Sequence, residues 1–432
     1  MASTGRPIEQ AETQAGFAAA TAAGRARAGR RTKPARLRIL VVCHRFPFPP
    51  AGGAKVRAFH VIRHLNERHE VTVASMARSD AEAAEGAGIA EHCARYEMER
   101  VSETMQTARM VLALPTPRPS SFAFFDSAAL ARRIAALAAR ERFDLVLAHS
   151  SSVARYVEAL RGPVKIMDFC DMDSQKWLEY ARYKPFPLSL GYALEGRKLE
   201  RQERTIAHGF DVCTVATRSE LETLDGLGTG AATDWFPNGV DTQYFTPTAE
   251  PYDPDTLVFV GRMDYFPNQE CMVRFCDDVF PRVRAQRPAA KLIIVGADPT
   301  SAVRALAGRE GVTVTGSVPD VRPYLSRAAV MVATLNIARG TQNKILEGMA
   351  AGVPVVTTPL AAGGVDAHAS THFLVASTAD EQAAAIVRVL TDRSERDRLA
   401  RAGRERMLSH HTWAMSMQRL DGIVHRCLER RA

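Results

Sequence analysis

The chain of 432 residues contains no apolar run of about eighteen residues, the shortest length from which a membrane-spanning helix is expected. Its alanine-rich beginning also lacks the basic end followed by an apolar stretch that marks a secretory signal. Both absences argue against a membrane-spanning or secreted protein. We therefore expect a cytoplasmic one.

Cysteine is scarce as well. The seven cysteines are odd in number and scattered, and the nearest pair, Cys271 and Cys276, has no second pair that would complete a tetrahedral metal site. The sequence thus predicts reduced thiols, without a disulfide framework or a metal centre.

Positive charge is concentrated at one end of the chain. The formal net charge is +8, but residues 1 to 38 carry eight arginines and lysines against Glu9 and Glu12. The remainder is therefore near neutral, at about +2, which argues against nucleic acid as its partner. Residues 1 to 36 are predicted to form a disordered basic tail, with contact to an anionic membrane surface as an alternative role.

Apolar residues, 46% of the chain, are sufficient for two domains with full cores. Apolar runs alternate with segments of helical spacing, such as 127 to 141 and 191 to 208, and this alternation is typical of an α/β fold with doubly wound parallel sheets. The predicted strands of the first sheet include 37 to 43, 70 to 75, 143 to 149 and 211 to 217. Those of the second are 257 to 261, 291 to 296, 312 to 316, 330 to 334 and 353 to 358.

A proline-containing stretch, 247 to 255, separates the two patterns and predicts the domain boundary. We therefore expect one domain at 37 to 250 and a second at 255 to 408. A helical pattern over 409 to 432 ends the chain.

Residues 339 to 358 combine a polar glycine turn, an apolar helix and a buried strand. Ile345 and Met349 recur at helical spacing, and Gly352 is predicted to end the helix. The helix start is expected to bind an anion such as phosphate, because its unpaired N–H groups and its dipole favour negative charge.

Two charged residues strengthen this expectation. Lys344 is unfavourable in a first helical turn unless an anion balances it. Glu347 follows on the same side as Asn343, where its carboxylate could accept hydrogen bonds from sugar hydroxyls. The alternative is a solvated Lys-Glu pair on an amphipathic helix.

The segment RGTQNKILEGMAAGVPVVTT resembles the donor-binding signature of glycosyltransferase family 4, retaining sugar transferases of the GT-B fold. In this family a glutamate before Met-Ala-x-Gly-x-Pro-Val-Val holds the ribose of a nucleotide-sugar, and Glu347 matches it. The other donor-binding residues expected in the segment are Gly340, Thr341 and Asn343.

One position departs from the family's pattern. A glutamate that touches the transferred sugar usually stands eight positions before the ribose-binding one, and here that position is Arg339. We expect Arg339 to contact the donor or acceptor through an anionic group such as a uronic acid carboxylate, because a guanidinium pairs bidentately with a carboxylate. The segment RGTQNKILEGMA resembles that of a subgroup linked to exosortase (PEP-CTERM) exopolysaccharide loci.

The same resemblance extends to the rest of the second domain. Gly261 and Arg262 resemble the family's phosphate-contacting Gly-Arg, and Val318 lies where members line the base pocket. Arg262 and Lys344 are therefore predicted to stabilise the diphosphate during catalysis.

In the first domain, Gly52 and Gly53 permit close backbone approach to the donor, in a loop that family members carry at the cleft between domains. His149 ends a strand where a family histidine contacts the transferred sugar, and is assigned a catalytic role. The predicted acceptor contacts are Arg57, Asp168 and Asp171. Asp171 and Asp173 also imitate a DxD metal motif, but enzymes of the GT-B fold need no metal, so we expect neither metal nor cofactor.

The resemblance implies two Rossmann-like domains that face each other across a cleft, with the C-terminal helix crossing back to the first. It implies a hexosyltransferase-type enzyme that transfers a sugar, with retention, from a donor such as a UDP- or GDP-sugar to a glycan or polyprenyl-diphosphate-linked acceptor. Exopolysaccharide or cell-surface polysaccharide biosynthesis would be the setting, in the cytoplasm or peripherally at the inner face of the membrane.

Two other functions remain open on the same scaffold. A nucleotide-sugar epimerase would release an altered sugar without an acceptor. A noncatalytic sugar-nucleotide binding partner would bind the donor without turnover, an alternative that Arg339 motivates.

Overall fold

A computed structural model of the protein describes residues 36–50 and 52–431. The predicted basic tail, 1 to 36, lies outside this part of the chain apart from Arg36, so what the sequence predicts for it stays a prediction.

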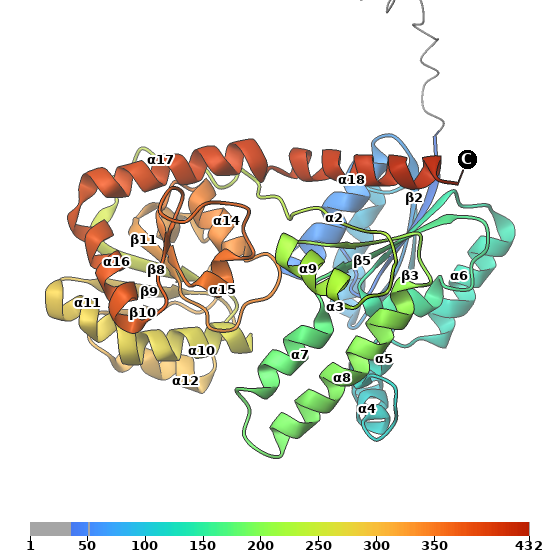
Figure 1. Ribbon diagram of the computed structural model, residues 1–432, viewed down its shortest axis with the longest axis horizontal. Helices are drawn as coiled ribbons and strands as arrows, with labels where there is room; N and C mark the ends of the chain where they lie inside the picture. The colour runs from blue at the N-terminus through green and yellow to red at the C-terminus, as the bar shows by residue number, and fades with distance from the viewer. Residues whose placement is uncertain (1–35, 51, 432) are drawn as a thin grey trace, which may run out of the picture. The chain divides into compact units, whose positions relative to one another are not determined.

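In the described part of the chain, seven parallel strands form the first sheet in the order β3-β2-β1-β4-β5-β6-β7 (Figure 1). Their bounds are β1 Arg38–Cys43, β2 Glu70–Ala77, β3 Arg95–Arg100, β4 Leu145–His149, β5 Val164–Cys170, β6 Val212–Val215 and β7 Thr233–Trp235. Winding reverses between β1 and β4, where Cys43 pairs with His149. Open α/β sheets bind ligands at such a switch point.

Six parallel strands form the second sheet in the described residues, in the order β10-β9-β8-β11-β12-β13. They are β8 Asp253–Val260, β9 Lys291–Val295, β10 Val312–Val314, β11 Ala328–Ala333, β12 Val355–Thr357 and β13 Leu374–Val375. The second switch point lies between β8 and β11. The predicted linker, 247 to 255, lies between the two sheets except for its last three residues, which begin β8.

Helices cover both sheets. Those between the strands of the first sheet are α2 Gly53–Asn66, α3 Asp80–Gly86, α4 Glu103–Ala113, α5 Ser120–Phe124, α6 Ala128–Arg140, α7 Asp173–Ala181, α8 Leu188–Ala207 and α9 Arg218–Gly226, with 3-10 turns η1 Ala87–Glu91 and η2 Ser151–Tyr156. Those of the second part are α10 Phe266–Arg274, η3 Phe275–Val279, α11 Phe280–Gln286, α12 Ser301–Ala305, η4 Leu306–Gly308, α13 Arg322–Ser326, α14 Asn343–Ala350, α15 Pro359–Ala362 and α16 Ala379–Thr391.

The central strands are mostly apolar because both of their faces are covered. In β1, every residue after Arg38 is buried. Leu40 and Val42 pack with Leu130 and Ile134 of α6 in one apolar cluster. These residues confirm the two doubly wound sheets that the sequence predicts.

The helix that the sequence predicts over 409 to 432 is α18 Trp413–Glu429, and it follows a further helix, α17 Arg393–His410. Trp413 stacks on His60 of α2 with ring centroids 3.9 Å apart, and Arg419 donates to the carbonyl oxygen of Trp235. The last helix therefore returns to the first sheet, as expected. None of the helices in residues 36–50 and 52–431 has both the length and the apolar content that crossing a membrane requires.

Candidate functional site

The turn and helix predicted to bind the donor are present. Gly340 has a φ of 60°, and a Cβ atom there would collide with the carboxylate of Asp171. Helix α14 follows and ends before Gly352, which has a φ of 72°. The buried residues of α14 include Ile345 and Met349, as the sequence predicts, together with Leu346 and Ala350.

Lys344 and Glu347 occupy the exposed side of the helix start, yet both are partly buried. Burial lowers the pKa of Lys344 to about 8 and raises that of Glu347 to about 7, an effect that the charge of Lys344 only partly offsets. In the described residues the Glu347 carboxylate has no hydrogen-bond donor. The environment thus differs from that of a freely solvated pair, and leaves Glu347 able to accept hydrogen bonds.

Asn268 holds Lys344 in place, a role that was not predicted from the sequence. Its Oδ1 accepts a hydrogen bond of 2.6 Å from the Lys344 Nζ, and its Nδ2 donates to the carbonyl oxygen of Arg262 at 2.8 Å. A Cβ atom at Gly261 would lie 2.7 Å from that Nδ2, so Gly261 makes room for the asparagine. The available signal was the position of Asn268 in the first turn of α10, six residues after Arg262.

The backbone carbonyl oxygen of Arg262 is bonded to Asn268, but the Arg262 side chain pairs with two carboxylates. The guanidinium donates to Asp264 at 2.7 Å and to Asp298 at 2.6 Å, and its side chain is largely exposed. A phosphate contact at Arg262 stays a prediction, and it would have to form beside these two carboxylates.

Thr341 and Val318 are two further predicted donor-binding residues of the second domain. The Thr341 hydroxyl is buried and has no hydrogen-bond partner among the described residues, which makes it available to a ligand. Val318 follows β10, is partly buried and packs against the core of the second sheet.

The glycine loop of the first domain meets the same helix start. Gly52 has a φ of 88° directly before α2, and an atom in the Cβ position of Gly53 would lie 3.6 Å from the Asn343 Nδ2. The Asn343 Oδ1 accepts a hydrogen bond of 3.2 Å from Asn238. The structure thus brings the predicted residues Gly53 and Asn343 together.

Arg57 and Asp168 form an internal ion pair, 1% and 0% exposed. The Arg57 Nε and Nη2 donate to the two carboxylate oxygens of Asp168 at 2.9 and 3.0 Å, and Nη1 donates to the carbonyl oxygen of Phe236 and to Asn238. Burial opposes ionisation of Asp168, but the charge of Arg57 and the hydrogen bonds from His149 and Arg57 outweigh it and hold the pKa of Asp168 far below its usual value. Direct acceptor contact was expected of both residues; their burial favours a supporting role instead, because neither presents a group at the surface.

His149 belongs to this buried group. Its Nδ1 lies 3.0 Å from the Asp168 Oδ2, and the Cys170 Sγ is 3.5 Å away. The sequence assigns His149 a sugar contact, but the structure buries the ring, so this placement also favours support over direct contact. The ligand atoms of His149, Asp168 and Cys170 lie within 4.8 Å of one another, yet the cation of Arg57 on both Asp168 oxygens disfavours a metal ion there.

Asp171, the third predicted acceptor contact, is more accessible. Burial and the nearby charge of Glu220 raise its pKa to about 7. The backbone N–H of Gly340 donates to Glu220, so Asp171 and Glu220 both lie at the turn before α14.

Arg339 is paired with carboxylates of the first domain. Its Nε lies 3.3 Å from the Glu179 Oε2, and its Nη1 lies 3.7 Å from the Glu220 Oε1. The sequence predicts an anionic partner for this arginine, and the structure supplies that partner from within the chain. A uronic acid partner is therefore not needed to explain why position 339 carries a positive charge.

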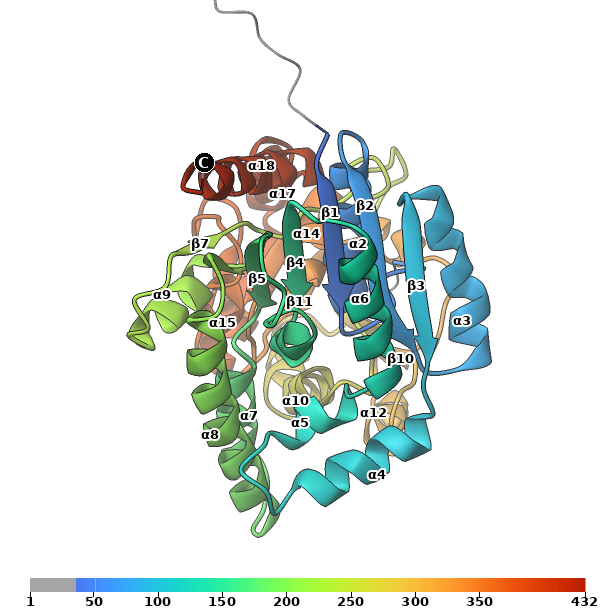
Figure 2. The ribbon, with the colours of Figure 1, turned by 90° about the vertical axis from the view of Figure 1, so that its right-hand side faces the viewer.

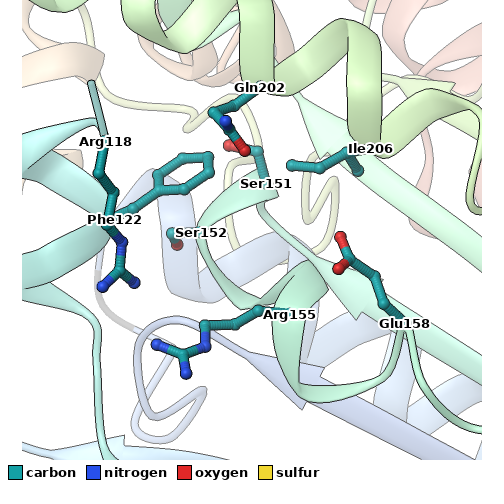
Figure 3. A pocket seen from close by; sticks show the side chains of 8 residues that line it. All are labelled: Arg118, Phe122, Ser151, Ser152, Arg155, Glu158, Gln202 and Ile206. Carbon is teal, nitrogen blue, oxygen red and sulfur yellow. The ribbon is translucent and has the colours of Figure 1, made fainter.

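A cavity of about 250 Å³ lies elsewhere, between α5, η2 and α8 (Figure 3). Its lining residues are Arg118, Phe122, Ser151, Ser152, Arg155, Glu158, Gln202 and Ile206. None of the predicted site residues is among them.

Two family descriptions match the chain. Residues 51–244 match "Glycosyltransferase Family 4", and residues 254–392 match "Glycosyl transferases group 1". No curated protein sequence matches it.

Solved structures share the arrangement of elements at low sequence identity. The sucrose-phosphate synthase of Thermosynechococcus elongatus is 20% identical, with a TM-score of 0.67 over 92% of this chain and 100% of that one. HepE of Anabaena, in complex with UDP and glucose, is 14% identical, with a TM-score of 0.65 over 90% and 100%. An E. coli protein described as trehalose-6-phosphate, bound with UDP-2-fluoro glucose, is 14% identical, with a TM-score of 0.61 over 89% and 98%.

Proposed function

Since the protein is a family 4 glycosyltransferase of the GT-B fold, we propose that it moves a sugar from a nucleotide-sugar to a glycan or lipid-linked acceptor, with retention at the anomeric carbon. The proposal includes a role in exopolysaccharide or cell-surface polysaccharide biosynthesis, in the subgroup associated with exosortase loci. The motif RGTQNKILEGMA supports that subgroup.

One observation carries the proposal: the start of α14 gathers an amine, an unbonded carboxylate and an unpartnered hydroxyl. Lys344 and the helix N-terminus supply positive charge for a diphosphate. Glu347, one turn further, has acceptor capacity for the two ribose hydroxyls, and the Thr341 hydroxyl is available between the two domains' loops.

Catalysis would then depend on positioning and on charge stabilisation. In a front-face reaction, the acceptor oxygen attacks the anomeric carbon on the side from which the nucleotide diphosphate leaves, and a diphosphate oxygen takes the acceptor proton. The bond from the sugar to the diphosphate breaks as the new glycosidic bond forms. Lys344 and the N–H groups of α14 stabilise the negative charge that develops on the diphosphate, so no side-chain nucleophile, metal or cofactor is required.

A UDP-sugar is the first donor to test, because HepE of Anabaena has been solved with UDP-glucose. The acceptor is proposed to be a polyprenyl-diphosphate-linked glycan, which would bring the enzyme to the inner face of a membrane.

The test is an assay of the purified protein with UDP- and GDP-sugars, each with and without an undecaprenyl-diphosphate glycan. We expect the glycosylated lipid and free nucleotide diphosphate to form together, and NMR of the product to show the donor's anomeric configuration. Glu347→Gln should lose most of this activity, whereas Glu405→Gln, at an exposed position of α17, should keep it.

Each other outcome has a distinct meaning. An altered free sugar formed without acceptor would replace the proposal by an epimerase. Donor binding without any turnover would indicate a noncatalytic partner, and an inverted linkage would contradict retention.

A further inference from the structure

Large apolar side chains lie exposed at one edge of the first domain. Phe186, in the turn between α7 and α8, is 81% exposed, and Leu112 of α4 is 74% exposed. We call this surface the apolar edge; its exposed apolar residues are Met105, Val111, Leu112, Leu114, Phe186, Leu188, Leu190 and Leu194. Single exposed apolar residues are ordinary, but a group of this size marks an interaction surface.

The two parts of the apolar edge are joined by hydrogen bonds. The Lys198 Nζ of α8 donates to the carbonyl oxygen of Leu114, directly after α4, at 2.7 Å. The buried carboxylate of Glu195 accepts from the backbone N–H groups of Ser120 and Ser121 at 3.0 and 2.9 Å. Figure 2 shows α4 and the turn between α7 and α8 together at the lower end of the domain. The edge is thus a fixed feature of the fold.

The charge of this edge is mainly positive, although α4 begins with an exposed acid, Glu103. Between residues 104 and 118 and between 182 and 198, the basic residues are Arg109, Arg118, Arg182, Lys184, Arg197 and Lys198. The one acid in these ranges, Glu195, is buried and already bonded. Arg118 pairs with Asp126, and Lys184 lies over the ring of Phe266, so the others carry most of the exposed charge.

Exposed leucine and phenylalanine side chains surrounded by arginine and lysine suit an anionic bilayer. Apolar groups enter the boundary between headgroups and acyl chains, while long basic side chains reach the phosphates. A soluble acidic protein would match the charge but not the row of aliphatic side chains on two separate elements.

We propose that the apolar edge docks the protein on the surface of a membrane that contains anionic lipids. The α7–α8 turn and α4 are in contact with the lipid, and no segment crosses the bilayer. The proposal rests on these side chains and does not depend on which sugar is transferred.

Vesicle sedimentation tests the docking directly. The full chain is mixed with vesicles of phosphatidylcholine alone or with added phosphatidylglycerol, and we expect binding to the mixed vesicles that salt weakens. Leu112→Ser combined with Phe186→Ser should lower the partition coefficient of the protein onto the mixed vesicles by at least about tenfold. The matched control combines Leu408→Ser and Met415→Ser, two exposed apolar residues of α17 and α18, and should bind as the unaltered protein does.

A second measurement separates this surface from the basic tail. In Phe186→Trp, quenching of the new tryptophan by brominated lipids reports contact at the edge itself, and the control Leu408→Trp should show no added quenching. Equal vesicle binding by the serine variants and their control, or absence of quenching in Phe186→Trp, would overturn the proposal. So would a dimer in sedimentation equilibrium that the serine changes dissociate, because the edge would then bind a second copy of the chain.

Discussion

The Nε of Arg339, in the second domain, lies 3.3 Å from the Oε2 of Glu179 on α7 of the first domain. The same helix brings the Tyr180 hydroxyl within 3.1 Å of the Tyr265 hydroxyl. Contacts from α7 therefore reach the second domain at the turn before α14 and at the start of α10. Arg339 thus links the two domains, because carboxylates of the first domain neutralise its positive charge.

We first predict that Arg339→Ala lowers kcat/KM equally for neutral and uronic acid substrates. A partly exposed ion pair is worth up to about 1 kcal/mol, so the loss should be up to about fivefold. Glu179→Ala should have a similar effect, and the double variant should lose less than the product of the two. A loss confined to uronic acid substrates would instead establish Arg339 as an anion receptor.

The pH profile of donor use should be bell-shaped. The pKa of Glu347 is raised to about 7 and that of Lys344 is lowered to about 8, both by burial. The free enzyme would bind the donor best with Glu347 ionised and Lys344 protonated, so kcat/KM should rise through pH 7 and fall above pH 8. Glu347→Gln should remove the acidic limb and Lys344→Met the alkaline limb, whereas Glu405→Gln should leave both.

Glu347→Gln should also weaken nucleotide diphosphate binding by about ten- to a hundredfold, because each charge-assisted hydrogen bond contributes roughly 1.5 to 3 kcal/mol. Its stability should not fall. The folded pKa of Glu347 lies above the unfolded value of about 4.3, so the ionised side chain destabilises the fold as pH rises between them, and removing it reverses that loss. Calorimetric titration and thermal unfolding measure the two effects. Unchanged affinity with a large fall in Tm would show a structural residue.

Asn268→Ala should reduce both donor use and stability. It leaves the carbonyl oxygen of Arg262 and the amine of Lys344 without their partner, and an unsatisfied buried group costs about 1 to 3 kcal/mol. Urea unfolding and donor KM measure the effects. Gln286→Ala, on the exposed end of α11, serves as the control, and a variant with normal KM would exclude Asn268 from positioning Lys344.

Arg57→Met should destabilise the protein by about 3 to 5 kcal/mol, because it leaves a buried carboxylate unpaired. The pKa of Asp168 is lowered in the folded state, so its contribution is present above the unfolded value of about 3.9 and is lost as pH falls below it. The stability difference between the unaltered protein and Asp168→Asn should therefore shrink below pH ~4 in urea titrations. A constant difference would contradict the internal ion pair.

The sequence was sufficient for elements whose periodicity is strong. The strand 37 to 43, the helix 127 to 141 and the apolar face of α14 are confirmed because one burial pattern runs through each of them. The edge strand β3 was not predicted: its sequence RYEMER is only partly buried, so it carries no clear alternation. The helical segment from α10 to α11 is interrupted by the π-helix η3, which the spacing of apolar residues alone does not reveal.

At the candidate site, the contacts that could not be predicted join residues far apart in the sequence. Local sequence identified Lys344 and Glu347, because a basic residue at a helix start conflicts with the dipole. It could not show that Arg57 lies against Asp168, since the two are 111 positions apart and meet only in the folded first domain. Glu179, which pairs with Arg339, is 160 positions away from it, so this partner could not be predicted either.

The position of α18 has a consequence for synthesis of the protein. Trp413 stacks on His60 of α2, and Arg419 and Arg426 bond to Trp235 and Asp234 of β7, the last strand of the first sheet. The ribosome therefore synthesises every strand of the first sheet long before α18. The ring of His60 and the carbonyl oxygen of Trp235 lack their α18 partners until that helix is made. The first domain is thus completed by a helix that is translated only after the second sheet.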